Sequence, residues 1–179
     1  MPGVFLVRHA TPDWQRMDLP YHRPPGPPLI EKGLTESGAL GAYLLATGVK
    51  RVISSPLERC LRTARIAAEA IGVEVQVDER LIEWQPDESP EQVYQRLWPL
   101  VETAWQSAAN GAPTALVTHG GPITVMLASF GMDRQTLQQF QCFDHKNPLP
   151  PGAVWYAGRA DENSPWELAL VFIPPNEEL

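Results

Sequence analysis

VFLVRHAT, residues 4–11, places four consecutive apolar residues directly before Arg8 and His9. A continuous apolar run of this length is typical of a strand that is buried on both faces of a parallel sheet. Residues 51–54 and 115–118 have the same character and predict two further central strands. The first strand therefore belongs to the middle of a sheet, and His9 lies just beyond its end.

Other segments complete an alternating pattern around these strands. Residues 73–77 alternate apolar and polar side chains, which indicates an edge strand, and residues 153–157 and 168–172 predict a late hairpin at a sheet edge. Helical patterns occupy residues 34–46, 57–71, 90–109 and 122–130. Alternation of strands and helices predicts an α/β three-layer sandwich with a mostly parallel central sheet and helices on both faces.

Composition narrows the class of protein. A chain of 179 residues, 44% of them hydrophobic, is long enough for one sizeable core, so we expect a single domain over residues 1–179. The net charge of −7 argues against nucleic acid or an anionic membrane as a partner. Cys60 and Cys142 are isolated, which predicts reduced, partly buried thiols and no metal site. No apolar run suggests a leader or a membrane span, so we expect a cytoplasmic protein, and the oligomeric state stays open.

Reactive residues follow three of the predicted strands: Arg8 and His9 after the first, residues 54–59 after the second, and His119 after the third. Ligands of open parallel sheets bind outside the carboxyl ends of the strands. One histidine at a strand end is most often a hydrogen-bonding loop residue. Two such histidines, with arginines close to both predicted strand ends, predict an anion site instead.

The segment after the second strand predicts where its helix starts. Ser55 and Glu58 have the spacing of a capping box, and Pro56 suits the first helical position, so the helix is expected to begin at Pro56. Arg59 then lies near the positive end of the helix dipole, where a cation is disfavoured unless an anion is near. Gly120 and its neighbouring glycine would let backbone N–H groups approach the same anion.

These motifs together resemble the histidine phosphatase superfamily, also called the cofactor-dependent phosphoglycerate mutase-like family. The resemblance rests on LVRH at residues 6–9, SSPLERCLRTA at 54–64 and VTHGG at 117–121. PLIEKG at residues 28–33 also looks like the start of that family's first helix. The resemblance implies a small helical cap, which residues 80–110 would form in reduced size.

The resemblance implies a role for each matching residue. His9 would be the nucleophile that forms a phosphohistidine, and Arg8, Arg59 and His119 would bind the phosphoryl oxygens. Gly120 would add its backbone N–H. The reaction needs no metal and no cofactor, and the substrate would be a small phosphorylated molecule.

Two further assignments depart from the family pattern. Glu83, in Leu-Ile-Glu at residues 81–83, matches the family's proton donor, but the motif that usually follows is missing, so Asp87 and Glu88 stay alternatives. Gln15 stands where the family has a phosphate-binding asparagine, and it could still donate an amide N–H to phosphate.

Three functions fit this pattern. A phosphatase is favoured, because between Glu83 and Gln106 only Arg96 could hold a second acidic group of the kind that a mutase binds. Mutase-type phosphoryl transfer is the alternative within the family. A phospho-ligand binding protein without catalysis is the other, and Thr11 and Gln15, which replace the usual family residues, keep it open.

The motifs assign no role to several aromatic and basic residues that lie near them in the sequence. Trp14 is close enough to His9 to form a wall of the site, whereas the other five tryptophans are expected to pack in the core or the cap. His22 and Arg23, in a proline-rich loop, either contact a substrate or simply cover the surface. His145 is expected to be structural or exposed.

Overall fold

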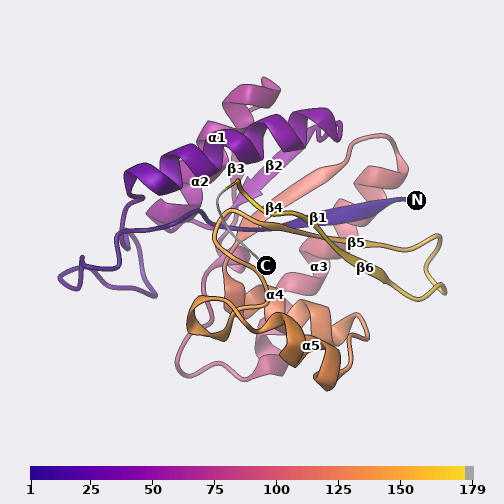
Figure 1. Ribbon diagram of the computed structural model, residues 1–179. Coiled ribbons are helices and arrows are strands. Elements are labelled where there is room, and N and C mark those ends of the chain that lie inside the picture. The colour runs from indigo at the N-terminus through magenta and orange to yellow at the C-terminus, as the bar shows by residue number, and fades with distance from the viewer. Residues whose placement is uncertain (176–179) are drawn as a thin grey trace.

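A single six-stranded sheet runs through the protein, which a computed structural model describes over residues 1–175 (Figure 1). Its order is β3-β2-β4-β1-β5-β6. The pairs β1–β4, β4–β2 and β2–β3 are parallel, and the pairs β1–β5 and β5–β6 are antiparallel. The strands are β1 Gly3–Arg8, β2 Arg51–Ser54, β3 Val75–Val77, β4 Thr114–Thr118, β5 Val154–Gly158 and β6 Glu167–Phe172. The mostly parallel sheet and its edge hairpin are confirmed.

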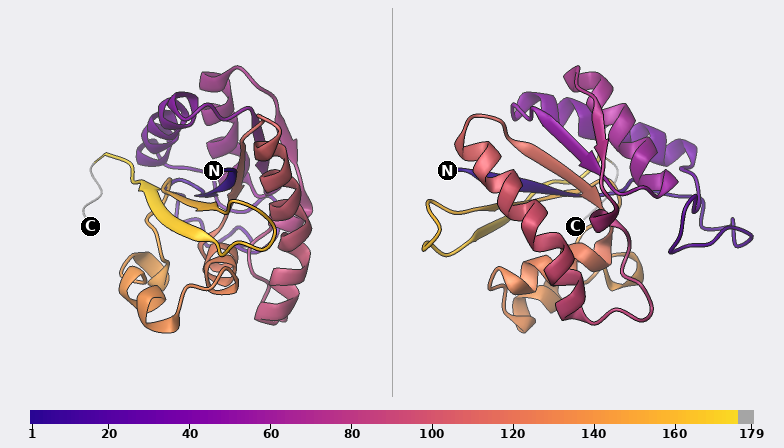
Figure 2. Two further views of the ribbon diagram at one scale, coloured as in Figure 1. Left: turned by 90° about the vertical axis from the view of Figure 1, so that its right-hand side faces the viewer. Right: turned by 180° about the vertical axis from the view of Figure 1, so that it is seen from behind.

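Helices cover both faces of this sheet (Figure 2). The helices are α1 Glu31–Ala46, α2 Glu58–Ile71, α3 Pro90–Ala109, α4 Gly120–Ser129 and α5 Arg134–Phe140, with the 3₁₀ turns η1 Glu79–Leu81 and η2 Asp144–Lys146. Successive residues of a strand point to opposite faces. Phe5 and Val7 accordingly pack in a core cluster with α1 and α2, whereas Val4 and Leu6 pack in another with α3 and α4. The predicted three-layer α/β sandwich is confirmed.

Helix α3 belongs to one of these layers. A capping box between Ser89 and Gln92 starts it, and Val93, Leu97 and Val101 are buried in the core cluster that it shares with the sheet. Most of the segment that we expected to form a reduced cap is therefore a helix packed on the sheet. Helix α5 was not expected. Its seven residues carry only two apolar side chains, Leu137 and Phe140, which pack partly buried against the core and make too short a stripe to predict a helix.

The start of α2 differs from the prediction. The helix begins at Glu58, with Leu57 as its N-cap and no capping hydrogen bond from a side chain. The Ser55 hydroxyl instead lies 2.9 Å from Nε2 of His119, and the Glu58 N–H donates to the carbonyl oxygen of Pro25. The predicted capping box is therefore wrong, because the serine that would form it contacts a histidine on another strand end.

The parallel strands bring three chain segments to one edge of the sheet. Arg8 is in register with Thr118, and Ser54 is in register with Val117, so β1, β2 and β4 end side by side. The long connection from β1 to α1 extends outward from this edge (Figures 1 and 2). No helix of residues 1–175 is long and apolar enough to cross a membrane.

Candidate active site

His9 lies at the centre of this edge and is 1% exposed. Its backbone N–H donates to the carbonyl oxygen of Thr118, which fixes it against β4. Its Nδ1 lies 2.8 Å from the carbonyl oxygen of Ala10. A carbonyl can only accept, so Nδ1 carries the proton and Nε2 of the neutral ring keeps its lone pair. Burial, followed by the charges of Arg59 and Arg8, holds the pKa of His9 well below its ordinary value.

Arg59 supplies a buried positive charge beside His9. It lies in the first turn of α2 and is 0% exposed. Its Nη1 donates to the carbonyl oxygen of Tyr21, whose ring lies 4.2 Å from the guanidinium carbon. Its Nε and Nη2 are buried without a hydrogen-bond partner among the described residues. Buried charged donors are rarely left unpaired, so this open edge of the guanidinium fits an anion.

Arg8 is held differently. Its Nη1 and Nη2 donate to the two carboxylate oxygens of Asp144, over 2.7 and 2.6 Å, and Nη1 also donates to the carbonyl oxygen of Leu149. Within residues 1–175 only its Nε lacks a partner. Arg8 is therefore a neutralised and oriented cation, whereas Arg59 keeps two donors that no described residue engages in a hydrogen bond.

His119 comes from the end of β4 and precedes α4. Its ring centroid lies 5.2 Å from that of His9, its Nε2 lies 2.9 Å from the Ser55 hydroxyl, and its Nδ1 lies 3.5 Å from a carboxyl oxygen of Glu83. Burial, followed by the charge of Arg59, lowers its pKa well below the ordinary value. The N–H of Gly120 follows in the first turn of α4, where the helix itself offers no acceptor.

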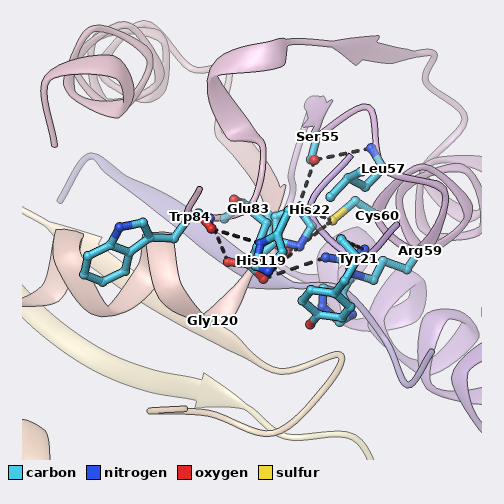
Figure 3. Close-up of polar contacts among 12 residues, drawn as sticks. Tyr21, His22, Ser55, Leu57, Arg59, Cys60, Glu83, Trp84, His119 and Gly120 are labelled. Atoms are coloured by element: carbon cyan, nitrogen blue, oxygen red, sulfur yellow. Dashed lines mark hydrogen bonds and ion pairs between the residues drawn. The ribbon is translucent and has the colours of Figure 1, made fainter. Parts of the chain in front are cut away.

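Glu83 completes the cluster (Figure 3). One carboxyl oxygen accepts from the Trp84 N–H at 2.9 Å, and the other lies 3.7 Å from Nη2 of Arg59. Burial raises the pKa of this carboxyl, and the Trp84 hydrogen bond and the Arg59 charge offset the rise only in part. A glutamate in this state keeps its proton to a higher pH than an exposed one and can donate it.

The sequence of this chain matches a known family over most of the region that builds the site. Residues 4–87 and 85–148 match the profile of the histidine phosphatase superfamily, branch 1. The chain belongs to this superfamily. The family assignment that the strand-end motifs suggested is thus confirmed.

Two kinds of comparison give individual relatives of this chain. A protein of Salmonella arizonae named "Probable phosphoglycerate mutase GpmB" is 35% identical over 83 residues, which cover 46% of this chain and 38% of the relative. The match therefore spans well under half of that relative. A mycobacterial glucosyl-3-phosphoglycerate phosphatase, solved with inorganic phosphate, superposes with a TM-score of 0.73 at 22% identity, over 94% of this chain and 96% of its own.

A phosphoglycerate mutase of Bacillus anthracis superposes with a TM-score of 0.69 at 16% identity, over 95% of this chain and 93% of its own. At such identities the two solved structures support the α/β fold of this chain and nothing finer.

The two alternative proton donors that the sequence offered lie elsewhere. Glu88 pairs with Arg96 at 2.6 Å, and this hydrogen bond lowers the pKa of Glu88, which makes it a poor proton donor. Asp87 lines an adjoining cavity together with Arg23, and it is not among the residues that line the cavity of Glu83. Gln15 is exposed, and its backbone N–H donates to the side chain of Asp13. The structure brings neither alternative carboxylate nor Gln15 into the cluster.

One segment of the site was not found from the sequence. Asp144, His145 and Asn147 lie around η2, where Asp144 binds Arg8 and the other two line the cavity in front of His9. His145 has a φ of 51°, which is uncommon outside glycine and is often found at functional sites. A Cβ on Gly120 would overlap the Asn147 side chain, so this glycine allows the segment to approach. The contact between Asp144 and Arg8 joins residues more than a hundred positions apart, so no local sequence pattern predicts it.

The cavity in front of the cluster has a volume of about 410 Å³. Trp14 and His22 line it, as the sequence suggested that they could. Trp84 and His145 line it too, although we expected them to serve packing or the surface. The site thus consists of a buried polar base and a wall rich in aromatic rings.

Proposed function

We propose that this protein is a phosphatase that hydrolyses a phosphomonoester of a small molecule through a phosphohistidine on His9. The observation that carries the proposal is the open edge of Arg59, two buried donors without a hydrogen-bond partner in the described chain, beside a neutral histidine. Phosphoryl oxygens accept hydrogen bonds in the fork geometry that a guanidinium offers. Membership of the histidine phosphatase superfamily supports the same assignment.

In the first step Nε2 of His9 attacks the phosphorus atom as the bond to the ester oxygen breaks. Arg59, Nε of Arg8, His119 and the N–H of Gly120 would surround the three remaining phosphoryl oxygens and stabilise their charge. Protonated Glu83 gives its proton to the departing oxygen, so the product leaves as an alcohol. General-acid catalysis of this kind contributes about 10²- to 10⁴-fold.

In the second step a water molecule attacks the phosphohistidine. Glu83, now a carboxylate, takes a proton from the water as the phosphorus–nitrogen bond breaks, and His9 returns to its neutral form. Inorganic phosphate leaves, and Glu83 is protonated again, so the cycle closes without an added reactant. A metal and a cofactor have no role in this scheme.

A mutase would need to hold a second acidic group of its substrate. The cavity in front of His9 is lined by aromatic, amide and histidine side chains and by Glu83, with no lysine or arginine among the described residues that line it. This lining favours release of phosphate over transfer to a second position. We also infer a small-molecule substrate, since the net charge of −7 does not suit nucleic acid, and we keep the cytoplasm as the proposed location.

Phosphate release from a panel of sugar phosphates, nucleotides and glycerate phosphates tests the proposal. We expect turnover of at least one ester, loss of turnover in His9→Ala, and acid-labile ³²P on the wild-type protein but not on the variant. Met17→Ala, on the exposed loop, serves as the control for handling and folding.

The alternatives predict other results. Isomerisation of 3-phosphoglycerate in the presence of catalytic bisphosphate, without free phosphate, would establish a mutase. Binding of phosphate without any labelled histidine would establish a non-catalytic binding protein. Turnover that survives in His9→Ala would contradict the nucleophile.

A further inference from the structure

The cavity beside His9 has room for the part of the substrate that is not phosphate. Its volume of about 410 Å³ lies within the roughly 300–1,000 Å³ of small-molecule sites. Glu83 lines this cavity, and its carboxyl lies 3.7 Å from Nη2 of Arg59 and 3.5 Å from Nδ1 of His119, so the cavity adjoins the buried cluster where the phosphoryl group binds in the proposed function. The wall of the cavity therefore contacts the alcohol portion of the ester.

Aromatic rings gather around Trp14 on this wall. The Trp14 ring is stacked with that of Tyr21, at 5.7 Å and 24°, and lies 5.0 Å from the ring of His145 and 6.5 Å from that of His9. Trp14 is still 37% exposed, so part of its surface is uncovered although three rings lie near it. A flat ring bound in the cavity would cover apolar surface and gain the stacking contacts that aromatic pairs favour.

The charged residues that line the wall also favour an alcohol portion without a second acidic group. Glu83 is the only acidic residue that lines the cavity among the described residues, and Lys and Arg are absent from that lining. His22 lies with Nδ1 3.0 Å from the carbonyl oxygen of Trp84, which engages one of its ring nitrogens. A second carboxylate or phosphate of a substrate would therefore meet rings and a glutamate rather than a cation.

We propose that the substrate of this site is a phosphate ester whose alcohol portion carries a planar aromatic ring, such as a nucleobase or an aryl group, packed against Trp14. The proposal rests on the phosphatase activity proposed above and names its substrate class. Trp14 is then a specificity-determining residue, with Tyr21 and His145 holding its ring in place.

The test compares ligands that differ only in aromaticity. 2-Phenylethyl and 2-cyclohexylethyl phosphate have primary alcohol leaving groups of similar size, so the need for proton donation is the same for both. We expect kcat/KM to be about tenfold higher for the phenyl ester, which is within the range of base–aromatic stacking. Adenosine 5′-monophosphate should exceed ribose 5-phosphate by a similar factor, and 3-phosphoglycerate should be the poorest substrate.

Variants of Trp14 test whether the preference for the phenyl ester depends on the Trp14 ring. Trp14→Leu keeps an apolar side chain and should bring the phenyl to cyclohexyl ratio close to one, mainly through KM for the phenyl ester. Trp14→Phe should restore most of the preference, and Met17→Ala, on the same loop but not in the cavity, should leave the wild-type ratio. A ratio that stays at ten in Trp14→Leu would overturn the role of Trp14.

A binding measurement separates this inference from the proposed function. Calorimetric titration of the full chain with 3-phenylpropyl and 3-cyclohexylpropyl phosphonate requires no catalysis. Tighter binding of the phenyl compound without turnover of any ester would support the aromatic site and contradict the phosphatase. Equal binding of the two phosphonates, or turnover that prefers 3-phosphoglycerate, would contradict the aromatic site.

Discussion

The site has two halves that the fold builds in different ways. The strand-end half lies at the ends of β1 and β4 and the start of α2, and it holds four side chains that are at most 1% exposed: Arg8, His9, Arg59 and His119. The loop half comes from residues 14–22 and 144–147 and carries the ring-lined wall. Regular structure thus fixes the groups that must be placed accurately for chemistry, and loops form the surface that meets the variable part of a substrate.

The two buried arginines differ in which half of the site supplies the carboxylate beside them. Arg59 lies 3.7 Å from the one carboxyl near it, Glu83, whose pKa is raised. Arg8 makes a bidentate ion pair with Asp144 of the loop half. When Glu83 is protonated, the buried base keeps about one uncompensated positive charge, which a phosphate group can neutralise. The loop half therefore sets part of the charge of the strand-end half.

The largest effect should come from the proton donor, which lies between the halves. Glu83→Gln keeps the size of the side chain but cannot donate a carboxyl proton. We expect kcat/KM to fall about 10²- to 10⁴-fold for alkyl phosphates and much less for 4-nitrophenyl phosphate, whose leaving group needs no proton. Steady-state kinetics with both esters measure this. An equal loss for both would exclude Glu83 as the acid.

The pH profile gives a second check on the same residue. The reaction needs neutral His9 and protonated Glu83. The pKa of His9 is lowered, so activity should be lost only as the pH falls well below 6.5. The pKa of Glu83 is raised, so the alkaline loss for an alkyl ester should lie above 4.5, and it should be absent from the residual alkyl turnover of Glu83→Gln. An unchanged alkaline limb in the variant would assign that limb to another group.

Arg59→Lys should have the next largest effect. Lysine keeps the charge but cannot present two parallel donors, and its ammonium would lose the Tyr21 ring contact in part. We expect kcat to fall about 10²-fold, in line with the loss of one preorganised donor to a transition state. Arg62→Lys, on the same helix and exposed, is the matched control. If both variants behave alike, Arg59 is not a phosphate ligand.

Asp144→Asn tests whether the loop half controls the charge of the base. The variant removes a negative charge that lies one side chain away from the phosphate position. We expect inorganic phosphate to inhibit roughly 15-fold more tightly, because two unit charges about 10 Å apart interact by about 1.7 kcal/mol at an effective dielectric of about 20. Asp144→Glu keeps the charge and should stay within threefold of wild type. An unchanged inhibition constant in Asp144→Asn would mean that Asp144 serves structure alone.

The strand-end half could be predicted from sequence because its signals are local. The apolar run of residues 4–7 and the residues after it predict both a central strand and its reactive end, and parallel pairing then brings β1, β2 and β4 together. The prediction was wrong where a local signal met a tertiary contact. Ser55 has the spacing of a cap, yet its hydroxyl contacts His119.

The loop half could not be predicted, since its contacts join residues that are far apart in the chain. Asp144 and Arg8 are 136 positions apart, and no pattern around either indicates the other. His145 adopts a positive φ, which a histidine in the sequence does not predict. The burial of Cys60 could not be predicted from the sequence either, because it depends on a contact with His119. The thiol is fully buried there, and burial raises its pKa to about 12.

Substitution of Gln15 should have the smallest effect. It tests whether the loop half also supplies a phosphate ligand. The family pattern places a phosphate ligand at this position, but the side chain is exposed in the structure. If the loop keeps this conformation during the reaction, Gln15→Ala should change kcat/KM by less than about threefold, as is usual for exposed positions. A loss above tenfold, without a change in the unfolding midpoint, would mean that the loop closes and delivers the Gln15 amide to the phosphate. Trp14, one residue earlier, would then move as well, and the preference for an aromatic ring would be a property of the closed loop.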